Sequence, residues 1–147
     1  MNNHFNRIPF AKTFLTALFA GIIATLVCLG FNIGFRMLTY YGPSDFINVS
    51  SIIFIVNLLL LVAGIAYYAF KTWSRRGDLI YTVFFLLLIA FCIWKTLGIH
   101  RFADLKVNRE FVQLLTGTII IIGIAALSIP YFYNHKKIVD IYYEAEV

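Results

Sequence analysis

The sequence predicts an all-α integral membrane protein, a single-domain bundle of four transmembrane helices that run up and down over residues 1–147. Three observations predict this fold class. Hydrophobic residues make up 61% of the chain and charged residues only 13%, against about 25% charged residues in an ordinary soluble domain. The charges leave four long uncharged stretches. The connections between these stretches are short, so there is no room for a separate soluble domain.

The uncharged stretches are the expected helices, because lipid cannot hydrate backbone groups and a spanning segment must satisfy them internally. The expected spans are residues 13–35, 46–70, 79–99 and 111–133. The first, second and fourth stretches exceed the roughly 18 apolar residues that identify a spanning helix. The third is long enough only if Lys95 lies inside its end, where the ammonium group can reach the headgroups.

Local signals suggest where these helices begin and end. Ser44 or Asp45 offers an N-cap for the second helix, and Asn108 offers one for the fourth. With that cap, Glu110 stands in the first turn of the fourth helix, where the helix dipole favours a negative charge. Pro130 predicts a kink or a frayed last turn late in the same helix.

The first span follows a basic start, so a cleaved signal peptide is an alternative interpretation. Its apolar run is longer than the 7 to 15 residues of a typical signal peptide. Val27 stands where a lipoprotein cleavage site needs a small residue. We therefore expect the segment to be retained as the first transmembrane helix.

The basic residues of the loops predict that both termini lie in the cytoplasm. Seven basic residues then flank the cytoplasmic side and five flank the other side, as the positive-inside rule favours. Segment 71–78 contributes three of the seven beside a tryptophan. In either orientation, the loops after the first and third spans share one side. Small size and the lack of eukaryotic signals favour a bacterial cytoplasmic membrane.

Five polar or charged residues form a candidate polar site: Asn32, Arg36, Asn57, Lys95 and Glu110. Asn57 lies near the middle of the second span, where an amide is costly unless it finds hydrogen bonds. We expect its side chain to point into the bundle, where it either joins two helices by hydrogen bonds or forms part of a ligand or ion path. The available hydroxyl partners are Thr16, Thr25, Thr116 and Thr118.

Asn32 and Arg36 are one turn apart and share a helix face. The five fixed donors of arginine suit a carboxylate or a phosphate. Asp45 and Glu110 are candidate intramolecular partners of Arg36, and an anionic headgroup or substrate is the alternative.

Small residues at a spacing of four form a candidate helix-packing face. Such residues matter because lipid gives helices no hydrophobic reason to associate, and close backbone approach must replace it. They serve either packing within the bundle or docking of a partner's helix. The residues of this face are Ala17, Gly21, Gly30, Gly34, Gly117 and Gly123.

The sequence shows no enzymatic constellation, and we expect no metal and no cofactor. It contains no HExxH, GxSxG, P-loop or paired CxxC motif. No Asp or Glu lies inside the expected spans, which argues against a proton-coupled carrier built on a membrane carboxylate. His4, His100 and His135 lie near or beyond span ends, which argues against haem ligation. Cys28 and Cys92 lie inside spans and give no disulfide framework.

These features favour a non-enzymatic interaction or accessory subunit of a membrane assembly or homo-oligomer. One alternative is a small carrier or channel with a polar path near Asn57, Asn32 and Arg36. Another is a protein that binds lipid headgroups. The net charge of +5 is spread over the membrane flanks, which points to membrane lipids as partners and not to nucleic acid. A membrane-protein partner or a second copy is the other expected partner.

Overall fold

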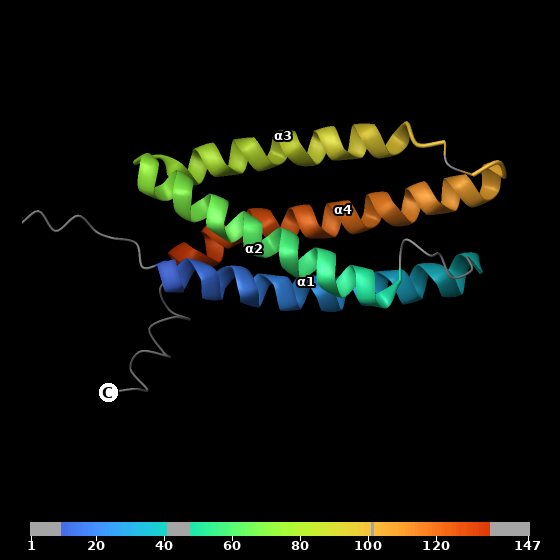
Figure 1. Ribbon diagram of the computed structural model, residues 1–147, viewed down its shortest axis with the longest axis horizontal. Helices are drawn as coiled ribbons and strands as arrows, with labels where there is room; N and C mark the ends of the chain where they lie inside the picture. The colour runs from blue at the N-terminus through green and yellow to red at the C-terminus, as the bar shows by residue number, and fades with distance from the viewer. Residues whose placement is uncertain (1–9, 41–47, 101, 136–147) are drawn as a thin grey trace, which may run out of the picture.

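A computed structural model confirms an all-α bundle of four long helices (Figure 1). It describes residues 10–40, 48–100 and 102–135. The helices are α1 (Phe10–Thr39), α2 (Val49–Trp73), α3 (Gly77–Leu97) and α4 (Leu105–Asn134). Each is long and apolar enough to cross a membrane. The chain is therefore a small multi-pass membrane protein with four candidate spans.

The helices do not end where the charges begin. α1 continues past Arg36 to Thr39, and α4 begins at Leu105, six residues before the expected span. Charged residues can extend a helix into the headgroup layer, because water and headgroups satisfy their side chains there. The uncharged runs therefore locate the membrane-crossing part of each helix but underestimate the lengths of α1 and α4.

Both expected N-caps are wrong. The Oδ1 atom of Asn48 accepts the Ser51 N–H at 2.7 Å and caps α2, in place of Ser44 or Asp45, which lie outside the described residues. Asp104 caps α4 by accepting the Lys106 N–H at 2.9 Å.

Asn108, the expected cap of α4, lies inside the helix instead. Its side chain donates to the Ile99 carbonyl at 3.0 Å and accepts the Phe102 N–H at 3.3 Å, so it fastens the connection between α3 and α4. Glu110 consequently lies in the second turn of α4 and not in the first. Several residues before each helix could act as caps, and the extended backbone of Asn48 and Asp104 selects these two.

The four helices form a rhombus in cross-section. α1 packs against α2 and α4, α3 packs against the same two helices, and α2 also meets α4. Figure 1 shows α2 crossing obliquely from the start of α3 to the second half of α1. α1 and α3 are therefore diagonal, as expected for an up-and-down bundle. Cys28 on α1 and Cys92 on α3 are both free.

The alternating helix directions define two ends of the bundle. The ends of α1 and α3 and the starts of α2 and α4 lie together, at the right of Figure 1. We call this the Arg36 end. The opposite end, where α2 turns into α3, is called the Asp78 end. Asn32, Arg36, Lys95 and Glu110 all belong to the Arg36 end.

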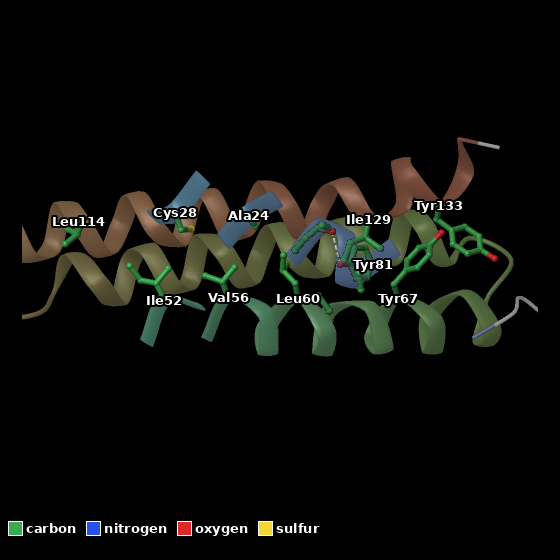
Figure 2. Close-up of a cluster of buried hydrophobic side chains, with 14 of the residues drawn as sticks. Ala24, Cys28, Ile52, Val56, Leu60, Tyr67, Tyr81, Leu114, Ile129 and Tyr133 are labelled. Carbon is green, nitrogen blue, oxygen red and sulfur yellow. Dashed lines mark hydrogen bonds between the residues drawn. The ribbon is translucent and has the colours of Figure 1, made fainter. Parts of the chain in front are cut away.

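The most deeply buried face of α1 carries small and polar side chains, and half-buried Leu29, Phe31 and Phe35 also pack against the core. Large apolar residues of α1, such as Leu26 and Ile22, are exposed on its outer side. The bulk of the core comes from other helices, including Val56 and Leu60 of α2 and Leu114 and Ile129 of α4 (Figure 2). This arrangement suits lipid, where helices associate by close approach of small residues. The buried residues of α1 are Thr13, Thr16, Ala17, Ala20, Gly21, Ala24, Thr25, Cys28 and Asn32.

Three tyrosines fill the core at the Asp78 end (Figure 2). The ring of Tyr67 on α2 lies 5.2 Å from the Tyr81 ring on α3 and 5.4 Å from the Tyr133 ring on α4, with edge-on geometry in both pairs. Lys12 of α1 places its ammonium 4.8 Å from the centre of the Tyr133 ring. All four helices therefore meet in this cluster. α4 also continues past Pro130 to Asn134 without ending.

Candidate interaction faces and polar sites

Four of the six predicted packing residues are used inside the bundle. A Cβ atom at Gly21 would lie 2.9 Å from the Asn57 Oδ1 atom of α2. Ala17 packs on Gly64 of α2 so closely that a Cβ at Gly64 would overlap the Ala17 side chain. On α4, Gly117 lies under the ring of Phe31, and a Cβ at Gly123 would lie 2.7 Å from the Ile89 side chain of α3.

Gly30 and Gly34 behave differently. A Cβ atom added at either residue would meet nothing within 4 Å. Gly30 is exposed and Gly34 is half-buried. They are one turn apart and form an open strip on the outer side of α1, which we call the Gly30–Gly34 strip. Exposed Leu26, Ile33 and Met37 lie nearby along the helix.

Asn57 is bonded within the bundle. Its Nδ2 atom donates to the Thr25 hydroxyl of α1 at 2.9 Å and to the Ile53 carbonyl at 2.7 Å. Thr25 is one of the four hydroxyl partners that the sequence offers. Its own hydroxyl donates to the Gly21 carbonyl at 2.7 Å. The resulting chain of hydrogen bonds joins α1 and α2 near the middle of both helices.

The five predicted polar residues are distributed over all four helices. Asn32 is buried on the inward side of α1, and Arg36 is half-buried one turn further along. Lys95 is exposed on α3, with its ammonium 5.6 Å from the Phe91 ring and 6.0 Å from the Trp94 ring. Lys95 thus lies on the helix diagonal to that of Asn32. Glu110 is half-buried in the second turn of α4.

Asp78, which lies outside the expected spans, accepts hydrogen bonds from side chains of two other helices. It lies in the first turn of α3. The Tyr67 hydroxyl donates to its Oδ1 atom at 2.6 Å. Its Oδ2 atom forms an ion pair with the Lys71 ammonium at 2.7 Å and accepts from the Asn134 amide at 3.3 Å. Asp78 therefore joins α2, α3 and α4 at their ends.

One sequence signal could have found part of this network. Tyr67 and Lys71 are separated by four residues and face the same way on α2, so a carboxylate just after the turn can reach both. Asn134 is 56 residues from Asp78, and only the bundle topology brings it close. Both carboxylate oxygens accept hydrogen bonds from protein donors, so the network ties the ends of three helices together.

Within the described ranges, no group of three or more His, Cys, Asp or Glu residues could hold a metal ion. Comparisons with protein-family models, curated proteins and solved structures gave no match.

Proposed function

We propose that this chain is a non-enzymatic interaction subunit, held in the cell membrane by four spans, that associates with a second copy of itself through the Gly30–Gly34 strip. The observation that supports this function is the contrast among the glycines of the bundle. Gly21, Gly64, Gly117 and Gly123 are covered by side chains of the same chain, whereas Gly30 and Gly34 have open space above them.

A second copy is the occupant that fits the strip best. Two glycines one turn apart let a helix backbone approach closely, and close approach drives helix association in lipid. A strip of this kind is complementary to itself, and a two-fold dimer places the same patch of both subunits in contact. The loop charges further favour cytoplasmic termini and a bacterial cytoplasmic membrane as the setting.

A small carrier or channel has less support. Of the residues proposed for a polar path, which are Asn57, Asn32 and Arg36, Asn57 already uses its amide donors to join α1 to α2.

The test is the oligomeric state of the purified protein in a mild detergent and in liposomes. We expect the wild type to form a dimer or a larger oligomer. Gly30→Leu and Gly34→Leu should each weaken association at least about tenfold, because a leucine side chain holds the two backbones apart. Ala90→Leu is the matched control, since Ala90 is exposed on α3 and gains the same bulk. It should leave association unchanged.

Two outcomes would count against this function. A wild type that is monomeric in liposomes at every protein density rules out self-association. An oligomer that survives both glycine variants places the interface elsewhere. If a different membrane protein co-purifies and is lost only with the glycine variants, the strip is the docking face but its occupant is that protein.

A further inference from the structure

The amide of Asn32 is buried without a hydrogen-bond partner. Only 5% of the residue is exposed, and its Nδ2 atom is covered and makes no hydrogen bond. Buried polar groups nearly always have partners in native proteins, and an exception points to an absent water, ion or ligand. An unpaired donor is costlier still in a bundle surrounded by lipid. Within the part of the chain that the structure describes, this donor therefore has no acceptor.

The packing of α1 on α2 shows where this amide lies. Ala17 meets Gly64, and Gly21 meets Asn57, so the two helices are antiparallel and in a defined register. Continuing this register brings Asn32, eleven residues beyond Gly21, to within about one helical turn of the level at which α2 begins. It also continues the inward face of Cys28, one turn earlier.

The start of α2 offers more donors. The first N–H groups of a helix have no intrahelical acceptor, and the helix dipole makes this end positive. The Asn48 side chain accepts one of them, the Ser51 N–H. Asn48, Val49 and Ser50 are exposed, so this helix start is accessible from outside. Helix starts of this kind bind phosphate and other anions.

Arg36 adds a positive charge to the same face. It is one turn beyond Asn32, about 6 Å further along α1 at 1.5 Å per residue. α1 has 30 residues and is about 45 Å long, longer than a hydrocarbon core of about 30 Å. Its last turns therefore reach the headgroup layer. At the same end, Tyr40 and Trp94 are exposed, as expected of interfacial aromatic residues.

We propose that the Asn32–Arg36 face of α1 and the start of α2 form a binding site for an oxyanion, namely the phosphate group of a membrane phospholipid or free phosphate. An amide N–H, helix N–H groups and a guanidinium suit an acceptor-rich anion. This site is independent of the Gly30–Gly34 strip, because residues two apart on a helix point to nearly opposite sides.

The experiment measures lipid binding by native mass spectrometry and thermal unfolding of the delipidated protein. Phosphatidylglycerol and phosphatidylcholine are the lipid probes, and inorganic phosphate against chloride at equal ionic strength is the free-anion probe. Asn32→Leu removes the amide with little change of volume. Arg36→Gln removes the charge. Arg109→Gln is the control, because Arg109 is exposed near the start of α4.

We expect Asn32→Leu and Arg36→Gln to lower the binding constant about tenfold each, the loss of one charge-assisted hydrogen bond. Arg109→Gln should bind as the wild type does. Without ligand, Asn32→Leu should be at least as stable as the wild type, because it removes an unpaired buried donor. If Asn32→Leu is as stable as the wild type, its weaker binding cannot be explained by misfolding.

The outcomes distinguish the sources of the anion. Stabilisation of the wild type by inorganic phosphate, lost in Asn32→Leu, identifies a free anion. Stabilisation by phospholipid alone identifies a headgroup. Equal binding by the wild type and Asn32→Leu overturns the proposal. Phosphate binding that appears only in Asp45→Asn also overturns it, because the occupant would then be the chain's own carboxylate. None of these results depends on the oligomeric state.

Discussion

The hydroxyl of Tyr81 on α3 donates a hydrogen bond of 2.8 Å to the backbone carbonyl of Ala126 on α4, shown as a dashed line in Figure 2. In a regular helix that carbonyl accepts the N–H of residue 130, but residue 130 is a proline and has no N–H. Tyr81 is fully buried, so water cannot take its place. A side chain of α3 thus supplies the donor that the sequence of α4 lacks.

Tyr81→Phe should lower the free energy of unfolding by about 1–3 kcal/mol, because it leaves a buried carbonyl without a donor. In the Pro130→Ala background the same change should have a smaller effect, since the substituted alanine restores the helical N–H. Reversible unfolding in mixed micelles of the two single variants and the double variant measures this difference. Tyr131→Phe, at an exposed position of α4, is the control. Equal effects of Tyr81→Phe in both backgrounds would contradict the pairing.

Asp78→Leu should lower the free energy of unfolding by about 2–4 kcal/mol, because the buried Tyr67 hydroxyl loses its acceptor and Lys71 loses its ion pair. Asp78→Asn should have a smaller effect, since an amide oxygen still accepts from Tyr67 and the ion pair is partly exposed. Chemical unfolding monitored by tyrosine and tryptophan fluorescence provides the measurement. Arg76→Gln, exposed in the same turn, should have almost no effect. If Asp78→Leu changed the free energy of unfolding no more than Arg76→Gln does, the network would not stabilise the bundle.

Gly64→Ala should destabilise the bundle by about 1–3 kcal/mol, because the new methyl group overlaps the Ala17 side chain of α1. Adding Ala17→Gly should recover part of the loss by making room. Gly30→Ala should be neutral or stabilising by up to about 1 kcal/mol, since alanine favours a helix and nothing lies above it. Thermal unfolding of monomeric protein in excess detergent separates these effects from association. Similar losses at residues 64 and 30 would be inconsistent with the packing described.

Asn57→Ala and Thr25→Val should each destabilise the bundle, and their effects should not add. A double-mutant cycle should give a coupling energy of about 0.6 kcal/mol, the typical value for hydrogen bonds between membrane helices. Flux assays of Asn57→Ala in liposomes test the carrier alternative in parallel. Additive effects on stability would show that the two side chains do not interact.

Single cysteines should report the arrangement of the ends in a membrane. In a background with Cys28 and Cys92 replaced by alanine, Tyr40→Cys and His100→Cys should react with a membrane-impermeant maleimide from the same side. Ser74→Cys should react only from the other side, which the loop charges predict to be the cytoplasm. Reaction of residues 40 and 100 from opposite sides would refute the four-span arrangement.

The helices themselves could be predicted from the sequence, because each uncharged run is long enough to span lipid and lipid permits little else than a helix. Their ends could not. Asn48 and Asp104 cap α2 and α4 because the backbone is extended at these residues, and neighbouring Ser, Asp and Asn residues look equally suitable in the sequence. Pro130 shows in the sequence that α4 lacks one backbone N–H, but no pattern in the sequence indicates that the Tyr81 hydroxyl donates the replacing hydrogen bond.

The sequence also could not show which glycines contact a neighbouring helix and which are uncovered. Gly21 and Gly30 occur in similar apolar surroundings on one helix, yet Gly21 meets α2 whereas Gly30 meets nothing. The difference depends on which side of α1 faces its neighbours, and α1 has apolar residues on its outer side and small residues inside. The Asp78 network was missed for a related reason, since its members, Asp78 included, come from three helices.

The inward face of α1 has a consequence for any attempt to make this protein soluble in water. A soluble bundle folds because hydrocarbon leaves water, yet the fully buried residues of α1 are only threonine, alanine, glycine, cysteine and asparagine, and its larger contribution is limited to half-buried Leu29, Phe31 and Phe35. Replacing its outer leucines and isoleucines with charged residues would give a soluble helix with a weak driving force to join the others. A water-soluble version would need a redesigned interior as well as a new surface.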